Sequence, residues 1–218
     1  MIGCGVVIGY GLESSLAAIS QQYRVLPPTR AWSPSREVRP RSEAPIIIAS
    51  SQSGLFGEYQ CELYRYGLVP QSFASPDEAD RYKKWLVRGE QVHYQRNNHN
   101  LSRCLVPISH FITEEFDGER FGKRYWQRKQ QPLFSVAGVY TQWQKPTKAV
   151  VKSFAVLTVP RNTATPGVDR TPVIIHERDW GAWLNPKRSF RGLGDLLEPM
   201  DERYLEAVGQ GVGGLVGV

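Results

Sequence analysis

Basic and aromatic side chains cluster at several places in this sequence, and together they favour binding to a single nucleic-acid strand. The segment from Arg120 to Lys129 surrounds Tyr125 and Trp126 with basic residues, and arginines recur between Arg24 and Arg41. Lysines follow between Lys145 and Lys152. A positively charged groove, with rings that stack on unpaired bases, is the physical requirement for such binding. We therefore expect single-stranded DNA as a partner, with core packing as the alternative for each ring.

Charge and composition permit this interpretation without proving it. The formal net charge is +6 and the isoelectric point is about 9.3, which also fits an ordinary solvated basic surface. At 218 residues with 41% hydrophobic content, the chain can bury a substantial core as one large domain or two small ones.

The cysteines and histidines argue against a metal site. Cys4, Cys61 and Cys104 are odd in number and lack metal-ligand spacing, which indicates a reducing compartment. The histidines have no zinc-type spacing either. No apolar run reaches the roughly 20 residues that cross a membrane, and the N-terminus has no basic start. We expect a cytoplasmic monomer with no membrane contact, no metal and no cofactor.

The elements that would position these side chains centre on the segment from Arg103 to Trp143. Bulky and β-branched residues predict one strand before Asp117-Gly118 and another after Pro132, and Asp117-Gly118 is a hairpin signal. The basic segment from Arg120 to Lys129 is expected to be a cationic loop between these two buried strands. Positive charge would then lie at the mouth of a β-rich core.

The rest of the chain predicts short strands with few helices. Strands are expected near residues 45–49, 59–69, 150–160 and 172–175, and helices near residues 13–23, 76–88, 177–184 and 193–198. This pattern predicts an α+β fold: a single domain with a β-barrel-like or sandwiched mixed sheet and a few short peripheral helices. The domain is expected to cover residues 1–208, followed by a glycine-rich tail over residues 209–218.

Several motifs, in this order, resemble the SOS-response-associated peptidase (SRAP) family over most of residues 60–200. They are Tyr66-Gly67-Leu68-Val69-Pro70, Arg103-Cys104-Leu105-Val106-Pro107, Ala137-Gly138-Val139-Tyr140, Asp169-Arg170-Thr171-Pro172 and Leu196-Leu197-Glu198-Pro199. The resemblance implies a protein that binds single-stranded DNA and traps abasic sites. An N-terminal cysteine, exposed after its leader is removed, condenses with the ring-opened sugar aldehyde in this family. The resulting imine closes with the thiol into a thiazolidine.

The resemblance assigns the nucleophile to Cys4. Cys4-Gly5 matches the family's Cys-Gly pair, but Met1-Ile2-Gly3 precedes it. A free α-amine on Cys4 requires cleavage after Gly3, and without it only a more reversible thiol adduct forms. Ordinary methionine removal is not expected, because Ile2 is bulky. The alternative for Cys4 is a small buried apolar side chain.

The family's acid and base residues are replaced in this chain. Its His corresponds to Val168, and its Glu corresponds to Thr113. Glu114 or Glu115 can substitute for that Glu if the strand carries a bulge, and the alternative is that both are solvated hairpin acids. We take Cys4, Glu114 and Glu115 as the catalytic candidates.

The expected DNA contacts come from the family motifs and from the basic clusters. Arg96 and Asn98 are remnants of an Asn-Ala-Arg-type motif, Thr158 matches a family Thr on the strand that faces DNA, and Arg170 matches a family Arg. An internal salt bridge is the alternative for Arg170. The full set of expected contacts is Arg36, Arg96, Asn98, Trp126, Thr158 and Arg170.

Three functions fit this sequence. The chain is an active abasic-site crosslinker, a binding-only relative that has lost the chemistry, or a phage-type or structural protein that keeps only the fold. The replaced His and Glu shift the balance from the first toward the second.

Overall fold

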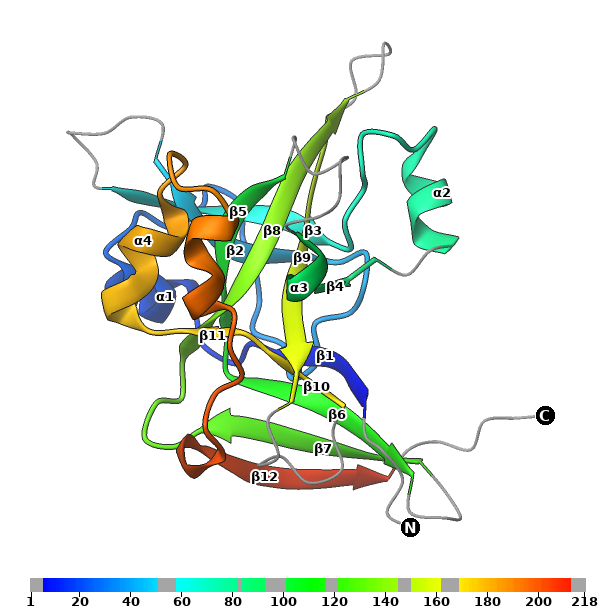
Figure 1. Ribbon diagram of the computed structural model, residues 1–218, viewed down its shortest axis with the longest axis vertical. Helices are drawn as coiled ribbons and strands as arrows, with labels where there is room; N and C mark the ends of the chain where they lie inside the picture. The colour runs from blue at the N-terminus through cyan, green and yellow to red at the C-terminus, as the bar shows by residue number, and fades with distance from the viewer. Residues whose placement is uncertain are drawn as a thin grey trace.

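Two β-sheets with short helices around them form the molecule (Figure 1). The computed structural model describes residues 6–50, 58–81, 84–92, 101–116, 121–144, 150–161 and 169–212. The arrangement is a single domain of mixed sheets with a few short helices, which confirms the α+β class expected from the sequence.

The larger sheet has eight strands in the order β10-β9-β3-β2-β5-β8-β11, with β4 also paired to β9. Their bounds are β2 (Glu43–Ala49), β3 (Tyr59–Tyr66), β4 (Leu86–Arg88), β5 (Ser102–Ile108), β8 (Phe134–Gln144), β9 (Val150–Pro160), β10 (Arg170–Pro172) and β11 (Ile174–Ile175). Strand β9 also pairs with β8, so the sheet curls back on itself. It stops short of a closed barrel: β2 and β5 are joined by the single residue pair Ile47–Leu105.

The smaller sheet has four strands in the order β1-β6-β7-β12. Their bounds are β1 (Val6–Gly11), β6 (His110–Phe116), β7 (Phe121–Arg128) and β12 (Leu205–Val212). Only Ser109 separates β5 from β6, so the chain passes directly from one sheet into the other. Strand β12 pairs with β7 as far as Val212 and therefore crosses the expected start of the tail at residue 209.

Strand β7 corrects the expectation of a cationic loop. Its basic residues stand on a strand paired with β6 on one side and β12 on the other. Alternation along the strand puts Arg124 and Trp126 on one face and Lys123 and Tyr125 on the other. Its aromatic residues Phe121, Tyr125 and Trp126 supply the β propensity that the charges obscure in the sequence.

The helices are short and lie at the periphery (Figure 1). They are α1 (Leu16–Tyr23), α2 (Pro76–Arg81), α3 (Gly89–Val92), α4 (Trp180–Leu184) and the 3₁₀ turns η2 (Glu177–Asp179), η3 (Arg191–Leu196) and η4 (Glu202–Tyr204). Helix α1 begins where the Ser15 hydroxyl accepts from the Ala18 backbone N–H, and it ends at Arg24, whose φ is 53°.

The helix expected to run from residue 76 to residue 88 is wrong at its end. Residues 86–88 form β4, which pairs in parallel with β9 from Leu86–Val156 to Arg88–Thr158. The backbone N–H of Val156 also donates to the Trp85 carbonyl at 3.0 Å. Long-range pairing with a buried strand therefore overrides the helical pattern of this segment.

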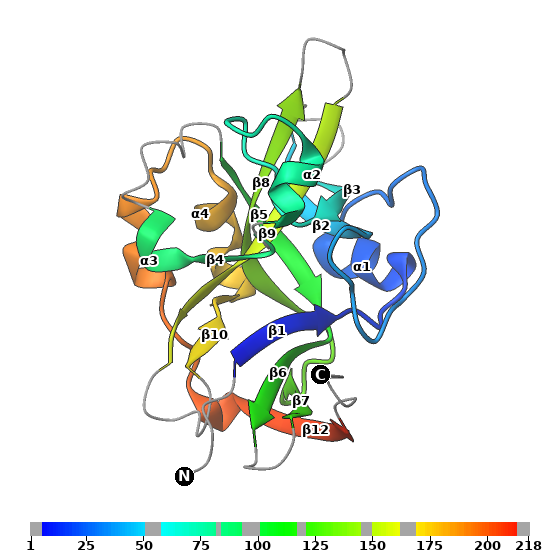
Figure 2. The same ribbon diagram turned by 90° about the vertical axis from the view of Figure 1, so that its right-hand side faces the viewer.

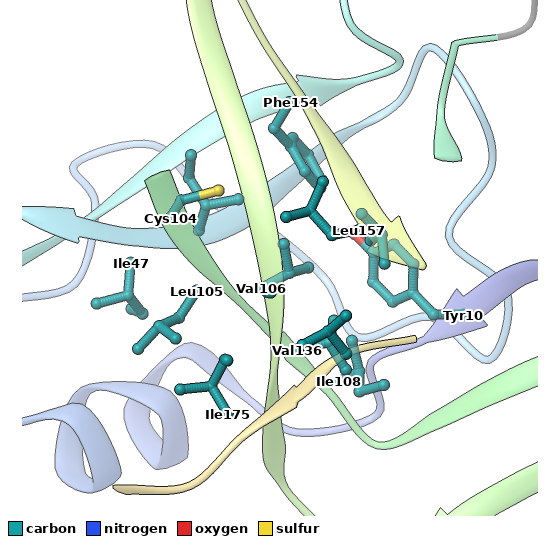
Figure 3. Close-up of a cluster of buried hydrophobic side chains, with 14 of the residues drawn as sticks. Tyr10, Ile47, Cys104, Leu105, Val106, Ile108, Val136, Phe154, Leu157 and Ile175 are labelled. Atoms are coloured by element: carbon teal, nitrogen blue, oxygen red, sulfur yellow. The ribbon is translucent and has the colours of Figure 1, made fainter. Parts of the chain in front are cut away.

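The apolar core lies where the strands of the larger sheet curl around one another (Figure 3). Leu105, Val136 and Leu157, from β5, β8 and β9, are fully buried there. A Cβ on Gly138 would lie 2.7 Å from Val106 Cγ2 and 2.8 Å from Cys104 Sγ, so only glycine fits at this crossing. Trp143 is also buried, in a second cluster with Val69 and Ala79.

Candidate nucleic-acid interface

Strands that carry several of the predicted site residues lie where the two sheets meet. The start of β1 pairs with β6 at Val6–Glu114, and β1 also contacts β10. Strand β10 in turn pairs with the end of β9, and Thr158 of β9 lies opposite Arg88 at the end of β4. Figure 2 shows β1, β10, β4 and α3 on one side of the molecule. We call the region formed by β1, β6, β10, the end of β9, β4 and α3 the junction.

Arg170 is held at the junction by four hydrogen bonds. Its Nε donates to Thr158 Oγ1 at 3.0 Å, and one Nη2 N–H donates to the Thr158 carbonyl at 2.7 Å. Its Nη1 and the second Nη2 N–H donate to the two carboxylate oxygens of Glu90 at 2.8 and 2.7 Å. Thr158 and Arg170, which the family resemblance named separately, are therefore in direct contact. The internal salt bridge that was the alternative for Arg170 is formed with Glu90.

Thr113 and Glu115 share one face of β6, because the β6–β7 register runs without a shift from Phe111 to Phe116. The same face carries Phe111, opposite Tyr10 of β1, and the Tyr10 ring packs edge-on against Tyr66 of the larger sheet at 5.1 Å. Thr113 and Glu115 therefore belong to the inward face of the smaller sheet. Glu114 belongs to the opposite face.

Glu115 is the more promising of the two acid candidates. Its Oε2 lies 3.0 Å from Nη2 of Arg124, and its side chain is mostly buried. Its other oxygen, Oε1, is buried and has no hydrogen-bond partner among the described residues. A buried carboxylate oxygen without a partner costs free energy unless a ligand or water meets it. The sequence made this substitution depend on a bulge, but the regular alternation of β6 puts Glu115 on the same face as Thr113.

Trp126 is part of the packing beneath the junction. The residue is only 9% exposed, and its Nε1 donates to Thr113 Oγ1 at 3.0 Å. Its ring stacks on Phe111, with 6.3 Å between centroids, and the guanidinium of Arg124 lies 5.5 Å above it. In this arrangement the ring offers little surface to a nucleic-acid base, and its contacts fix Thr113 and Arg124.

Arg36 lies at the outward face of the smaller sheet. Its guanidinium is 4.8 Å from the centroid of the Tyr125 ring, and its backbone carbonyl is 2.9 Å from His110 Nε2. His110 is buried, and burial lowers the pKa of its imidazole. The exposed Arg36 and the partly exposed Tyr125 form a cation and ring pair. This pair is on the opposite face of the sheet from Glu115.

The remaining predicted positions fall outside the described residues. These are Cys4, Arg96 and Asn98, together with Val168 at the position of the family's His. The two described cysteines are free and buried. Burial raises the pKa of Cys61 to about 12 and also raises the pKa of Cys104, so neither offers a reactive thiolate near neutral pH.

Within the described ranges, no group of three or more His, Cys, Asp or Glu side chains is arranged to hold a metal ion. No helix in the same ranges is long and apolar enough to cross a membrane.

Glu90 and Arg124 complete the junction, and sequence reasoning gave neither a role of its own. Glu90 is 80 residues from Arg170 in the chain and stands on the four-residue helix α3. No local pattern marks such a pair. Arg124 stands opposite Thr113 on β7. The sequence could have indicated this pairing only if β7 had been recognised as a strand.

Comparison with protein families gives one match across nearly the whole chain. The model described as SOS response associated peptidase (SRAP) matches residues 4–214. Among curated proteins, the chain is 27% identical over 206 residues to the abasic site processing protein YoqW of Bacillus subtilis, covering 91% of this chain and 89% of that protein. It is 26% identical to the abasic site processing protein YobE of the same organism, covering 91% of each.

Solved structures share the fold. A protein from Bacteroides thetaiotaomicron superposes with a TM-score of 0.78 at 21% identity, covering 91% of this chain and 89% of that one. A protein from Bordetella bronchiseptica superposes with a TM-score of 0.73 at 16% identity, covering 97% and 100%. The whole two-sheet arrangement is therefore shared with these proteins.

Proposed function

Because the chain belongs to the SRAP family, we propose that it binds single-stranded DNA at the junction and processes abasic sites there. The observation that carries the proposal is the family match over residues 4–214. The names of the relatives YoqW and YobE, abasic site processing proteins, support the same substrate class. The acting unit is proposed to be a single chain, free in the cytoplasm.

Arg170 is the proposed phosphate contact. Guanidinium groups bind phosphate oxygens through paired N–H donors, and Thr158 holds one edge of this one in place. Arg96 and Asn98 are proposed to act beside it, as the family resemblance implies. Arg36, stacked on Tyr125, is proposed to bind the strand farther along its path. Trp126 supports this interface from below, because it fixes Thr113 and Arg124.

Cys4 is the proposed nucleophile. After removal of residues 1–3, its α-amine adds to the C1′ aldehyde of the ring-opened abasic sugar, and loss of one water leaves an imine. The thiol then adds across the imine, with sulfur bonding to C1′ and the proton going to nitrogen, which gives a thiazolidine. An amine with a pKa near 8 and a thiol with a pKa near 8.5 react in this way at neutral pH.

Chain length and the position of β1 support placing this chemistry at the junction. Cys4 precedes Val6 by two residues, and two residues span at most roughly 7 Å. Val6 pairs with Glu114, next to Glu115, whose Oε1 has no described partner. We propose Glu115 as the group that moves protons during imine formation, in place of the family's Glu. Glu114, on the opposite face, is proposed to be structural.

The direct test is to mix the purified protein with single-stranded DNA that bears one abasic site, and to separate the products under denaturing conditions. We expect a covalent band that is absent with intact DNA and absent for Cys4→Ala. A matched control is Cys61→Ala, which removes a buried thiol with a raised pKa and leaves the band unchanged. A band that survives Cys4→Ala would exclude Cys4 as the nucleophile.

A binding-only function is the second candidate. Thr113 and Val168 stand where the family has its Glu and His, which favours lost chemistry. A salt-sensitive shift of intact and abasic DNA alike, without a covalent band, is the outcome that this alternative predicts.

A further inference from the structure

Glu90 occupies the side of Arg170 that a phosphate would use. Its two carboxylate oxygens accept from Nη1 and Nη2 at 2.8 and 2.7 Å, the paired arrangement that an anionic phosphate adopts on a guanidinium. An arginine has five N–H donors, and Thr158 with Glu90 takes four of them. A phosphate therefore reaches the paired donors of Arg170 only when Glu90 leaves them.

Glu90 is not required to position Arg170. Thr158 already fixes the guanidinium through its hydroxyl and its carbonyl, from a buried position on β9. The Arg170 side chain is 21% exposed and that of Glu90 is 42% exposed, so solvent weakens the ion pair and Glu90 can move away. Its departure would leave Arg170 oriented and charged.

We propose that Glu90 is a built-in competitor for the phosphate site at Arg170, so that DNA binds by displacing this carboxylate. The inference rests on the proposed function, since it takes Arg170 as a phosphate contact. Arg88, which ends β4 just before α3, lies close enough to lower the pKa of Glu90 by its charge. It gives the released carboxylate a second cation. A ligand that contacts only Arg170 gains little from this exchange, whereas a strand with several phosphates recovers the loss elsewhere.

The hydrogen bond from Arg170 also lowers the pKa of Glu90 below its ordinary value. The carboxylate therefore stays ionised near neutral pH, and protonation does not release Arg170. Competition is the route by which DNA gains access to this guanidinium.

The test measures the affinity of Glu90→Gln for an intact, fluorescently labelled single-stranded oligonucleotide over a series of salt concentrations. We expect binding about two- to fivefold tighter than that of the unmodified chain, the range that loss of an exposed ion-pair partner implies. The slope of log affinity against log salt should steepen by up to about one, because Arg170 then enters as an uncompensated cation.

Glu43→Gln is the matched control. Glu43 pairs with Arg30 at 2.7 Å and its side chain is 47% exposed, so this variant adds the same net charge at a similar ion pair. Affinity should stay near that of the unmodified chain. Equally tighter binding by both variants would show that total charge causes the effect. Unchanged or weaker binding by Glu90→Gln would show that Glu90 supports Arg170 and does not compete with DNA. Either result overturns the inference.

Arg170→Gln separates this inference from the proposed function. If the unmodified chain binds, Arg170→Gln weakens binding and Glu90→Gln fails to tighten it, only the inference about Glu90 is wrong. If the unmodified chain shows no binding even at low salt, the proposed function and the inference fail together.

Discussion

The buried interior of the two sheets and the junction are built from the same strands but differ in chemistry. Along β9, Phe154 through Leu157 are apolar and buried, whereas Thr158 turns its hydroxyl to the guanidinium of Arg170. Along β6, Phe111 and Ile112 are buried in the same way before Thr113, Glu114 and Glu115 follow. Each strand carries polar side chains where it reaches the junction. Stability and function therefore occupy successive residues of the same elements.

The two regions also differ in the charge of their buried polar groups. In the core these groups are uncharged: Trp183 Nε1 donates to the Cys104 carbonyl at 2.8 Å, and the hydroxyls of Tyr10 and Tyr66 are buried without a described partner. At the junction, Glu115 keeps one buried oxygen without a described partner, and Arg170 is neutralised by a carboxylate that solvent reaches. Groups held in this way are available to a ligand at a modest cost in free energy.

The largest expected effect is on the core side. Leu105→Ala removes a fully buried side chain from β5 and should lower the free energy of unfolding by about 2–5 kcal/mol. Urea denaturation measures the change, and affinity for single-stranded DNA should persist wherever the variant remains folded. Leu26→Ala, at a side chain that is 67% exposed, is the control and should change stability little. A similar loss in both variants would contradict the assignment of the core.

The next effect is on the rate of covalent trapping. Glu115→Gln should slow formation of the DNA–protein adduct by about a hundredfold or more, because a group that moves protons is lost. Equilibrium affinity for intact DNA should change little. Quenched time points on a denaturing gel give the rate. Glu114→Gln, on the other face of β6, is the matched control, and slowing by Glu114→Gln alone would reverse the assignment of the two acids.

A smaller effect is expected on affinity. Arg170→Ala should weaken binding of intact single-stranded DNA by about tenfold at low salt, because one phosphate contact is lost. Anisotropy titrations at several salt concentrations measure it, and the salt slope should become shallower by up to about one. Arg203→Ala, at an exposed arginine paired with Asp201, removes the same charge elsewhere. If both variants weaken DNA binding equally, the effect comes from net charge and not from a phosphate contact of Arg170.

The smallest effect concerns pH. Burial lowers the pKa of His110, whose ring is faced by Glu13, the Arg36 carbonyl and Tyr125. Below the ordinary value of 6.5 the unfolded chain binds the proton more readily than the folded chain does. Stability from this group is therefore complete above pH 6.5 and is lost as pH falls toward the lowered pKa. Urea unfolding from pH 7 to 5 should show a shallower decline for His110→Gln, and parallel declines would contradict this.

The sequence predicted the core better than the junction, for a physical reason. Continuous apolar runs predict buried strands, as in Leu105-Val106 and in Phe154 through Leu157, so the strands and the α+β class were predictable. β4 and β7 were mistaken for a helix and a loop. Their strand pairing depends on distant partners, which local propensity cannot report.

Within the junction, residues that match a family motif could be predicted from the sequence. Residues that only the fold brings together could not. Thr158 and Arg170 were named from motifs and lie in contact. Glu90 was missed because its partner is 80 residues away, and the choice between Glu114 and Glu115 required the register of β6. Trp126 was expected at the DNA, whereas its indole N–H is bonded to Thr113 in the packing beneath it.

The intact mass of the product formed with abasic single-stranded DNA is the most direct test of the proposal that Cys4 traps the sugar at the junction. We predict a species equal to the chain beginning at Cys4 plus the DNA minus one water, because imine formation releases water and thiazolidine closure releases nothing. Cys4→Ala should lack this species. An unmodified protein mass after full incubation, or an adduct on a chain that still begins at Met1 and persists in Cys4→Ala, would contradict the account.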